Sequence, residues 1–306
     1  MRRVVAGIDI GGTTTQVVLV DSELAVVAAG TTATPSSVGG EAMVTAACDL
    51  VRRLLETGDR VLTGIGVGVA GVVDRATATV LVASDSFHAW AGYRVGEHLS
   101  REFGVPVEIE NDVNVFLLAE ATTGAAVGGR DVLGVTLGTG VGGALLLDGR
   151  LFVGQTGAAG EIGHAPGFGS RGCTCGGRGH LETIASARSL AGCFQERTGR
   201  TLSAAEVALA AERGDPQARE LFAEVGSALA RMIVITTALL DLDTVVIGGG
   251  VSNAWELFDP ALRRSLEQEP PVRGTAPRVV RAGLGDGAAA LGAALLVRGA
   301  VPADRG

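Results

Sequence analysis

The 306-residue sequence contains no lysine, since all 25 basic residues are arginine. This absence excludes mechanisms that depend on an ammonium group. Among them are the phosphate-binding P-loop, the strand lysine of protein kinases and the Schiff base of pyridoxal enzymes. If the chain binds a nucleotide, it must hold the phosphates by other means.

Long apolar runs and targeting signals are also absent. No run approaches the ~20 apolar residues of a membrane-spanning helix, and the first residues form no apolar signal-peptide region. We therefore expect a soluble, cytoplasmic protein without a membrane partner. With 47% hydrophobic residues, a chain of this length has room for about two domains.

Basic clusters and a disulfide framework are missing as well. The net charge is −8 and the basic residues form no cluster beyond Arg-Arg pairs, which argues against nucleic acid as a partner. Four cysteines in 306 residues suit metal binding in a reducing compartment better than disulfides. We expect Cys48 and Cys193, which lie in apolar helical sequence, to be buried thiols.

The other two cysteines belong to the segment 160–182, GEIGHAPGFGSRGCTCGGRGHLE. Glu161 and Glu182 lie at its two ends, within three residues of the outer metal ligands. A metal-bound loop that holds carboxylates predicts a binding site. Four residues of the segment can close a tetrahedral nitrogen and sulfur site on one zinc ion: His164, Cys173, Cys175 and His180.

The pattern of strands and turns occurs twice along the chain. The first half begins with a strand, a glycine turn, a second strand from about Thr15, a turn at Asp21-Ser22 and a third strand. The same order recurs from Asp131, with a two-residue turn at Asp148-Gly149 before the third strand. Helical and strand patterns alternate after each opening. The sequence therefore predicts a duplicated α/β unit.

Glycine turns follow the first strand of each half, and both are candidates for ATP binding. A phosphate can approach backbone N–H groups closely at glycine, and neighbouring hydroxyls add donors. In the second half, residues 138–143 match such a turn, with contacts expected from Gly138, Thr139 and Gly140. In the first half, the candidates are Asp9, which could orient water around magnesium, and Gly11, Gly12, Thr13 and Thr14.

Each of these turns has a second interpretation, because a hairpin turn between buried strands also favours glycine. Their equivalent places in the two halves favour phosphate binding. A third turn lies in VVIGGGVSN, where Gly249 and Gly250 follow a predicted strand. It could support an adenosine on exposed backbone, or serve only as a tight turn between a strand and a helix.

Several motifs occur in one order along nearly the whole chain: DIGGTTTQVVLVD, GVGVAGVVD, ENDVN, LGTGVGG, GAAGEIGH, C-x-C-G-x-x-G with Glu182, and VVIGGGVS. In this order they resemble the ROK family of sugar kinases and sugar-responsive repressors. The resemblance implies a two-domain, actin-like and ribonuclease-H-like α/β fold, in which ATP and a hexose meet in the cleft between the domains. We expect a small domain of residues 1–118, completed by a C-terminal helix of residues 288–306, and a larger domain of residues 119–287.

The resemblance identifies Asp112 as the base that accepts the proton of the sugar hydroxyl. It also implies sugar contacts from Asn111 and from the backbone of Gly71, although this chain has Ala70 where the family often has proline. From the residues alone, the Asn-Asp pair between a predicted strand and helix has another interpretation. Either residue could be a helix N-cap, which would contribute about 1 kcal/mol.

Glu161, His164 and Glu182 match the family's other sugar contacts. Carboxylates and an imidazole suit hydroxyls that both donate and accept hydrogen bonds, although exposed glutamates are usually only solvated. One nitrogen of His164 could bind zinc while the other contacts the sugar. His180 replaces a third cysteine of the family, which leaves weaker metal binding or an empty site open.

These expectations describe an ATP-dependent hexose kinase with magnesium, a structural zinc ion and glucose as the preferred acceptor. Kinases for N-acetylglucosamine, mannose, fructose or allose are alternatives. Glu161 favours a glucose or N-acetylglucosamine pocket over the bacterial N-acetylmannosamine type. A sugar-sensing regulator is a further alternative, but the first predicted strand begins near Val4, without room for a DNA-binding segment before it. A non-catalytic sugar-binding module is the last. The resemblance also implies a homodimer or homotetramer.

Overall fold

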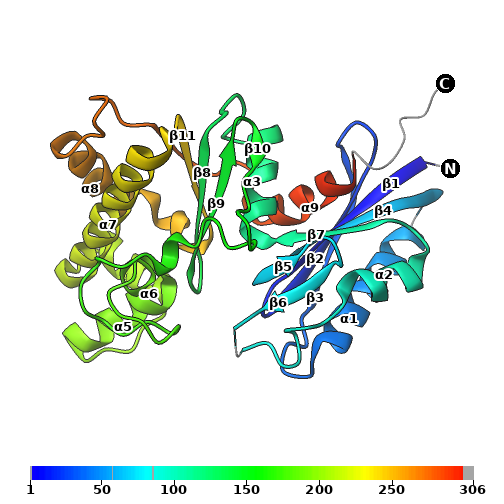
Figure 1. The fold of residues 1–306 in the computed structure, drawn as a ribbon. Coiled ribbons are helices and arrows are strands. Elements are labelled where there is room, and N and C mark those ends of the chain that lie inside the picture. Colours follow the sequence, from blue (N-terminus) through cyan, green and yellow to red (C-terminus); the bar gives the residue numbers. More distant parts are fainter. Residues whose placement is uncertain (1, 57, 85, 299–306) are drawn as a thin grey trace. The chain divides into compact units, whose positions relative to one another are not determined.

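The computed structural model describes residues 2–56, 58–84 and 86–298, and it divides the chain into two compact units (Figure 1). Unit 1 comprises residues 1–124, 154–158 and 286–306, and unit 2 comprises the remaining residues. The sequence suggested domain boundaries at residues 118 and 288. These boundaries stay a prediction and differ from the division into units 1 and 2. Residues 299–306 of the expected C-terminal helix lie outside the described residues.

Unit 1 is built on a five-stranded sheet with the order β3-β2-β1-β4-β7 among the described residues. β2 runs antiparallel to both of its neighbours, β1 and β3, whereas β1, β4 and β7 are parallel. The parallel strands therefore end at one edge of the sheet. The strands are β1 (Arg2–Ile10), β2 (Thr14–Val20), β3 (Val26–Ala33), β4 (Arg60–Val69) and β7 (Val107–Asn111).

Helices cover both faces of this sheet. On one side α1 (Gly40–Glu56) and α2 (Val95–Phe103) enclose the larger core, and on the other α9 (Ala288–Arg298) packs on β1 and β4 and against α3 (Asp112–Thr123). The backbones of α9 and β4 lie very close together: a Cβ added at Gly66 would lie 1.7 Å from the Ala293 carbonyl oxygen. The C-terminal helix α9 thus belongs to the fold of unit 1.

Unit 2 repeats this sheet, as the sequence predicted. Its strand order is β10-β9-β8-β11-β12 among the described residues, again with two antiparallel neighbours and two parallel ones. Asp148 and Gly149 both have positive φ, 51° and 75°, as the predicted two-residue hairpin turn requires. The strands are β8 (Val132–Leu137), β9 (Val141–Leu147), β10 (Arg150–Leu151), β11 (Thr244–Gly248) and β12 (Arg278–Arg281).

The long helix α7 (Pro216–Leu240) lies in the core of unit 2 and packs against α8 (Trp255–Gln268). The side chain of Asp215 caps its first turn and Pro216 occupies the first helical position, where a missing N–H costs nothing. Among the described residues, α7 alone is long and apolar enough to cross a membrane by length and composition. Its contacts with the core identify it as a core helix. The other helices of the unit are α4 (Glu182–Ala185), α5 (Ala187–Thr198) and α6 (Ala204–Glu212).

The sequence analysis missed two small features. A two-stranded hairpin of β5 (Val72–Asp74) and β6 (Thr79–Val82) follows β4, and the four-residue α4 follows the metal-loop segment. The expected buried thiols are confirmed, since Cys48 and Cys193 are both buried and free, and burial raises the pKa of the Cys48 thiol to about 11.

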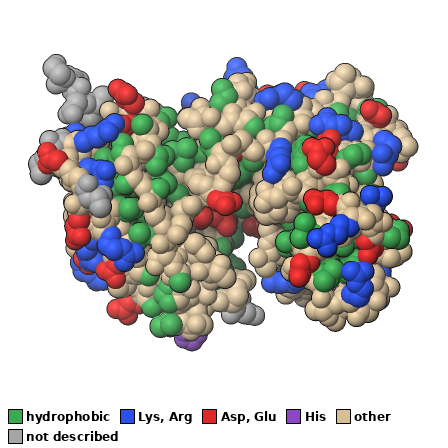
Figure 2. Space-filling model, turned by 180° about the vertical axis from the view of Figure 1, so that it is seen from behind, with side chains coloured by type: hydrophobic (Ala, Val, Ile, Leu, Met, Phe, Trp, Pro, Cys, Tyr) green, Lys and Arg blue, Asp and Glu red, His purple; other side chains and the backbone are tan. Residues whose placement is uncertain are grey.

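The surface carries mixed charges. On the face shown in Figure 2, arginine side chains alternate with aspartate and glutamate over the described residues, and they do not gather into one basic patch. This distribution agrees with the net charge of −8.

Candidate functional site

Two acidic residues of unit 1 lie at the carboxyl ends of its parallel strands. The strand register pairs Asp9 of β1 with Gly68 of β4, and Asp112 follows the last residue of β7. A Cβ added at Gly68 would lie 3.8 Å from Asp9 Oδ1 and 3.7 Å from the Asp112 Cα. The same Cβ would meet Val115 Cγ2 at 2.7 Å, so a side chain at Gly68 would displace its neighbours. The two aspartates thus flank one glycine, at the strand edge where α/β folds bind their ligands.

Asp9 lies close enough to Asp112 for the two carboxyl groups to interact. Burial, and to a smaller degree the charge of Asp112, raises the pKa of Asp9 to about 7. A divalent cation near Asp9 would relieve this repulsion, and oxygen donors are what magnesium prefers. The residues present would therefore fit a magnesium ion beside Asp9.

Asn111 caps helix α3, which settles one of the two interpretations of the Asn-Asp pair. Its Oδ1 accepts hydrogen bonds from the backbone N–H of Val113, at 2.9 Å, and of Asn114, at 3.2 Å. Its Nδ2 donates to the Gly71 carbonyl oxygen at 3.1 Å. Asp112 is instead the first helical residue and is half-buried, where the helix N-terminus favours a negative charge.

Glu110, which the sequence analysis missed, fixes this segment from within the sheet. Its side chain is 2% exposed, and its Oε1 accepts from the Asn111 backbone N–H at 2.8 Å and from Asn114 Nδ2 at 2.9 Å. Arg75 Nε lies 3.1 Å from Oε2. The second carboxylate of β7, directly before Asn111 and Asp112, was the available signal.

The glycine turns are hairpin turns in both units. The Gly11 N–H donates to the Thr14 carbonyl oxygen at 3.1 Å, and the Gly138 N–H donates to the Gly140 carbonyl oxygen at 2.9 Å. Gly12, Thr13 and Thr14 are exposed. The sequence predicted an anion-binding turn over residues 138–143. The turn is shorter than that, because β9 begins at Val141 and residues 142 and 143 belong to the sheet.

The third glycine turn connects β11 to a short 3₁₀ helix, Gly250–Ala254. Gly249 has φ of 83°, and a Cβ there would lie 2.7 Å from the backbone of Leu137. Only glycine fits this close approach between neighbouring strands. The tight-turn interpretation thus accounts for Gly249, while contact with adenosine stays a prediction for both glycines.

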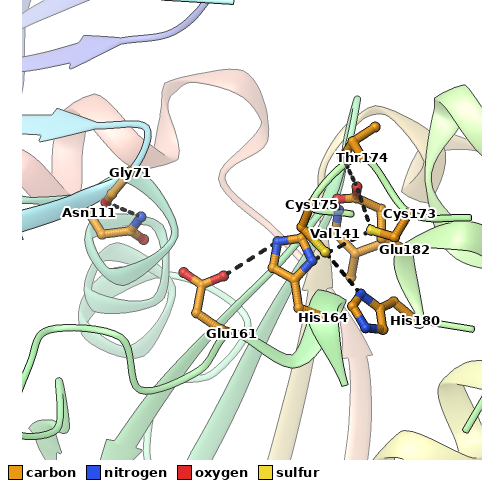
Figure 3. Close-up of polar contacts among 10 residues, drawn as sticks. All are labelled: Gly71, Asn111, Val141, Glu161, His164, Cys173, Thr174, Cys175, His180 and Glu182. Carbon is orange, nitrogen blue, oxygen red and sulfur yellow. Dashed lines mark hydrogen bonds and ion pairs between the residues drawn. The ribbon is translucent and has the colours of Figure 1, made fainter. Parts of the chain in front are cut away.

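The four predicted metal ligands of unit 2 meet in one cluster (Figure 3). Their ligand atoms all lie within 4.8 Å of one another. Within the cluster, His164 Nδ1 is 3.7 Å from Cys173 Sγ, and His180 Nδ1 is 3.3 Å from Cys175 Sγ. Two thiolates and two imidazoles in this arrangement fit a closed structural zinc site.

Backbone hydrogen bonds hold the metal loop, which we define as residues 160–182. Phe168 donates to the Gly179 carbonyl oxygen at 2.7 Å and Leu181 to that of Ala165 at 3.1 Å. A Cβ at Gly177 would lie 2.4 Å from the ring of His180, so glycine is needed where the ring passes. Contacts within the loop therefore hold it close to the shape that metal binding requires.

Two carboxylates flank the cluster. Glu161 Oε2 lies 4.0 Å from His164 Nε2, on the side of the ring opposite the cysteine sulfur. Glu182 accepts hydrogen bonds from the Val141 N–H and from the Thr174 hydroxyl (Figure 3). The second ring nitrogen of His164 and the Glu161 carboxylate therefore lie side by side.

The comparisons with known proteins agree with this fold. A family model described as ROK family matches residues 5–300. The chain belongs to the ROK family. Across the described residues it therefore has the two-domain, actin-like α/β fold that the sequence predicted.

Among the relatives of this ROK protein is a glucokinase of Thermotoga maritima, which is 32% identical over 95% of this chain and 96% of its own length. An N-acetyl-D-glucosamine kinase of Citrobacter koseri is 33% identical over 95% and 98%. The crystal structure of a ROK family glucokinase from Streptomyces griseus, in complex with glucose and AMPPNP, has a TM-score of 0.84 and 31% identity over 97% and 99%.

Proposed function

We propose that this protein transfers the γ-phosphoryl group of ATP to the 6-hydroxyl of glucose. Membership of the ROK family, with full-length relatives named as sugar kinases, makes it an ATP-dependent hexose kinase. The choice of glucose and of the hydroxyl, and the roles of individual residues, are our proposal.

The pair of Asp9 and Asp112 carries the proposal. In the reaction the sugar oxygen attacks the γ-phosphorus, ADP leaves, and Asp112 accepts the proton of the hydroxyl. Asp9 orients water around magnesium, which when bound with ATP neutralises charge on the phosphates. The raised pKa of Asp9 supports this assignment, because a nearby cation would stabilise the charged form of a carboxyl group that burial and Asp112 destabilise.

Asn111 and Gly71 help to position Asp112, and we assign both to contacts with the sugar. The hydrogen bond from Asn111 Nδ2 to the Gly71 carbonyl oxygen ties the turn after β4 to the start of α3. Because Asn111 Oδ1 is used by the helix cap, the remaining Nδ2 proton is the group we assign to a sugar hydroxyl. A sugar contact and a helix cap are thus combined in one side chain.

In unit 2 we assign Glu161, His164 and Glu182 to the remaining hydroxyls of the sugar. Backbone and hydroxyl donors already orient Glu182, and a zinc ion in the four-residue cluster would orient His164. An acceptor that lacks one matching hydroxyl would leave one of these polar groups without its partner, which gives selectivity.

For the nucleotide we assign the two glycine turns to the phosphates and Gly249 with Gly250 to adenosine. The exposed backbone and hydroxyls of Gly12, Thr13 and Thr14 support the first assignment. We further propose that the zinc ion is structural, that the protein works in the cytoplasm, and that it forms a homodimer or homotetramer. Metal analysis and light scattering of the purified protein test the zinc ion and the oligomer.

A panel of acceptors and donors tests the function. The purified protein is assayed with ATP or polyphosphate and with glucose, N-acetylglucosamine, mannose, fructose and allose, and the pairs are ranked by kcat/KM. We expect glucose with ATP to rank first by at least about tenfold, as loss of one matched polar contact predicts. Another sugar in first place contradicts the glucose assignment alone, and no transfer to any sugar contradicts the kinase assignment.

A further inference from the structure

Glu182 is held by protein donors on both of its oxygens. The Val141 backbone N–H donates to Oε2 at 3.0 Å, and the Thr174 hydroxyl donates to Oε1 at 3.2 Å (Figure 3). Cys173 Sγ lies 3.9 Å from the same Oε1. The orientation of this carboxylate is therefore set before a ligand arrives.

These donors come from parts of unit 2 that are distant in sequence. Val141 begins β9 directly after the glycine turn of Gly138–Gly140, whereas Thr174 lies between the two cysteines of the metal cluster. The turn and the carboxylate are in close contact, because a Cβ at Gly140 would lie 2.3 Å from Glu182 Oε2. Glu182 thus connects the glycine turn to the metal loop.

Thr174 has no packing reason to point at Glu182, since its side chain is exposed. Its direction follows from the backbone around it, where the Cys173 N–H donates to the Gly177 carbonyl oxygen at 2.9 Å. Cys173 and Cys175 flank it, and both belong to the predicted ligand set. A metal ion bound by both cysteines would fix the backbone on each side of the Thr174 hydroxyl.

We propose that Thr174 is a positioning residue for sugar binding, whose hydroxyl orients Glu182 and makes sugar affinity depend on metal in the four-residue cluster. The inference rests on the proposed function, because it needs Glu182 to contact the sugar. Holding the carboxylate in its binding orientation removes part of the ordering cost that the sugar would otherwise meet. The hydroxyl, more than the methyl group of threonine, provides this effect.

Two substitutions separate the hydroxyl from the shape of the side chain. Thr174→Val keeps the shape and removes the donor, and Thr174→Ser keeps the donor. We expect Thr174→Val to raise both the KM for glucose and the calorimetric Kd for glucose without ATP by about five- to tenfold, as loss of one hydrogen bond to a charged acceptor predicts. Thr174→Ser stays within about twofold, and so does Thr201→Val, which alters another exposed threonine of unit 2.

Metal removal tests the dependence on the cluster. Zinc per chain is measured for each protein, and glucose binding is titrated before and after treatment with a chelator. We expect equal zinc content in wild type and Thr174→Val. Chelation should weaken glucose binding in Thr174→Val by a factor at least about threefold smaller than in wild type, because two changes that act through one contact are not additive.

Several results would overturn the inference. They are a glucose KM within about twofold of wild type in Thr174→Val, equal weakening by Thr174→Ser, loss of zinc in Thr174→Val, or equal chelation effects in both proteins. Each of them leaves the kinase assignment intact. A wild-type protein that phosphorylates no hexose overturns the proposed function itself.

Discussion

The two sheets share one strand order but carry different chemistry. Asp9 and Thr136 occupy matching positions, since each is the next-to-last residue of its strand, and they pair with Gly68 and Gly248 of the neighbouring parallel strands. Both are half-buried, but Asp9 is an acid with a raised pKa and Thr136 carries a hydroxyl. Duplication kept the scaffold, and the side chains at the strand ends diverged.

The acids of unit 2 come from a different source. In unit 1 the chain passes from β3 to α1 through residues 34–39. The connection from β10 to α4 of unit 2 takes residues 152–181, of which 154–158 belong to unit 1. Glu161 lies in this long connection, and Glu182 follows its last residue. Long connections with little secondary structure order poorly unless something ties them together. The comparison indicates that strand ends position the acids of unit 1, while a long loop held by its own hydrogen bonds positions Glu161 and Glu182.

The largest expected difference between the matching positions is in catalysis. Asp9→Asn should lower kcat by about a hundredfold or more, because it removes a charge that stabilises the phosphoryl-transfer site. Thr136→Val should lower kcat by less than about threefold. Steady-state assays at several magnesium concentrations check this. Equal losses of kcat in the two variants would mean that Asp9 and Thr136 contribute equally to catalysis.

The buried Glu110 provides the next largest effect, on stability. Glu110→Ala should reduce the free energy of unfolding by about 2–3 kcal/mol, because it leaves the Asn111 N–H and the Asn114 amide without their acceptor. The exposed Glu161 is its matched control, and Glu161→Ala should cost less than about 0.5 kcal/mol. Urea unfolding without ligands measures both. A loss below about 0.5 kcal/mol in Glu110→Ala would contradict the proposed role of the network.

The raised pKa of Asp9 predicts a dependence of stability on pH. Above its ordinary pKa of 3.8, the unfolded chain has lost the Asp9 proton while the folded protein keeps it up to about pH 7. The free energy of unfolding contributed by Asp9 therefore falls as pH rises from about 4 to 7 and is constant above. Asp9→Asn should lack this fall. Unfolding curves without magnesium check it, and parallel curves for both proteins would contradict the assigned pKa.

The smallest effect concerns the metal loop. His180→Ala should lose zinc and raise the KM for glucose by about tenfold, whereas His180→Cys, which restores the ligand of the family, should keep about one zinc per chain. Metal analysis and steady-state assays measure the two effects. Unchanged glucose affinity in a zinc-free His180→Ala protein would show that the loop keeps its shape by backbone hydrogen bonds alone.

The sequence predicted features that depend on local spacing. The strands, the hairpin turn at Asp148-Gly149 and the gathering of His164, Cys173, Cys175 and His180 follow from residues close together in the chain. The cap of α3 was ambiguous, because Asn and Asp are both good N-caps, and only coordinates identify Asn111.

Contacts across long sequence distances were not predictable. The hydrogen bond between Glu182 and Val141 depends on how the metal loop returns to the sheet, and the ion pair between Arg75 and Glu110 depends on the hairpin of β5 and β6 that the sequence analysis missed. Neither leaves a periodic or compositional pattern in the sequence. The first contact involves Glu182 and the second lies next to Asn111, and we assign both of these residues to sugar binding.

The turnover number of Asp112→Asn with ATP and glucose tests the central claim most directly, namely that a strand-end acid of unit 1 performs the chemistry. Asparagine keeps the size of the side chain and removes the base. We predict a kcat about a thousandfold below that of wild type, with unchanged thermal unfolding and a glucose Kd within about threefold. A kcat within about tenfold of wild type would contradict the assignment of Asp112 as the base.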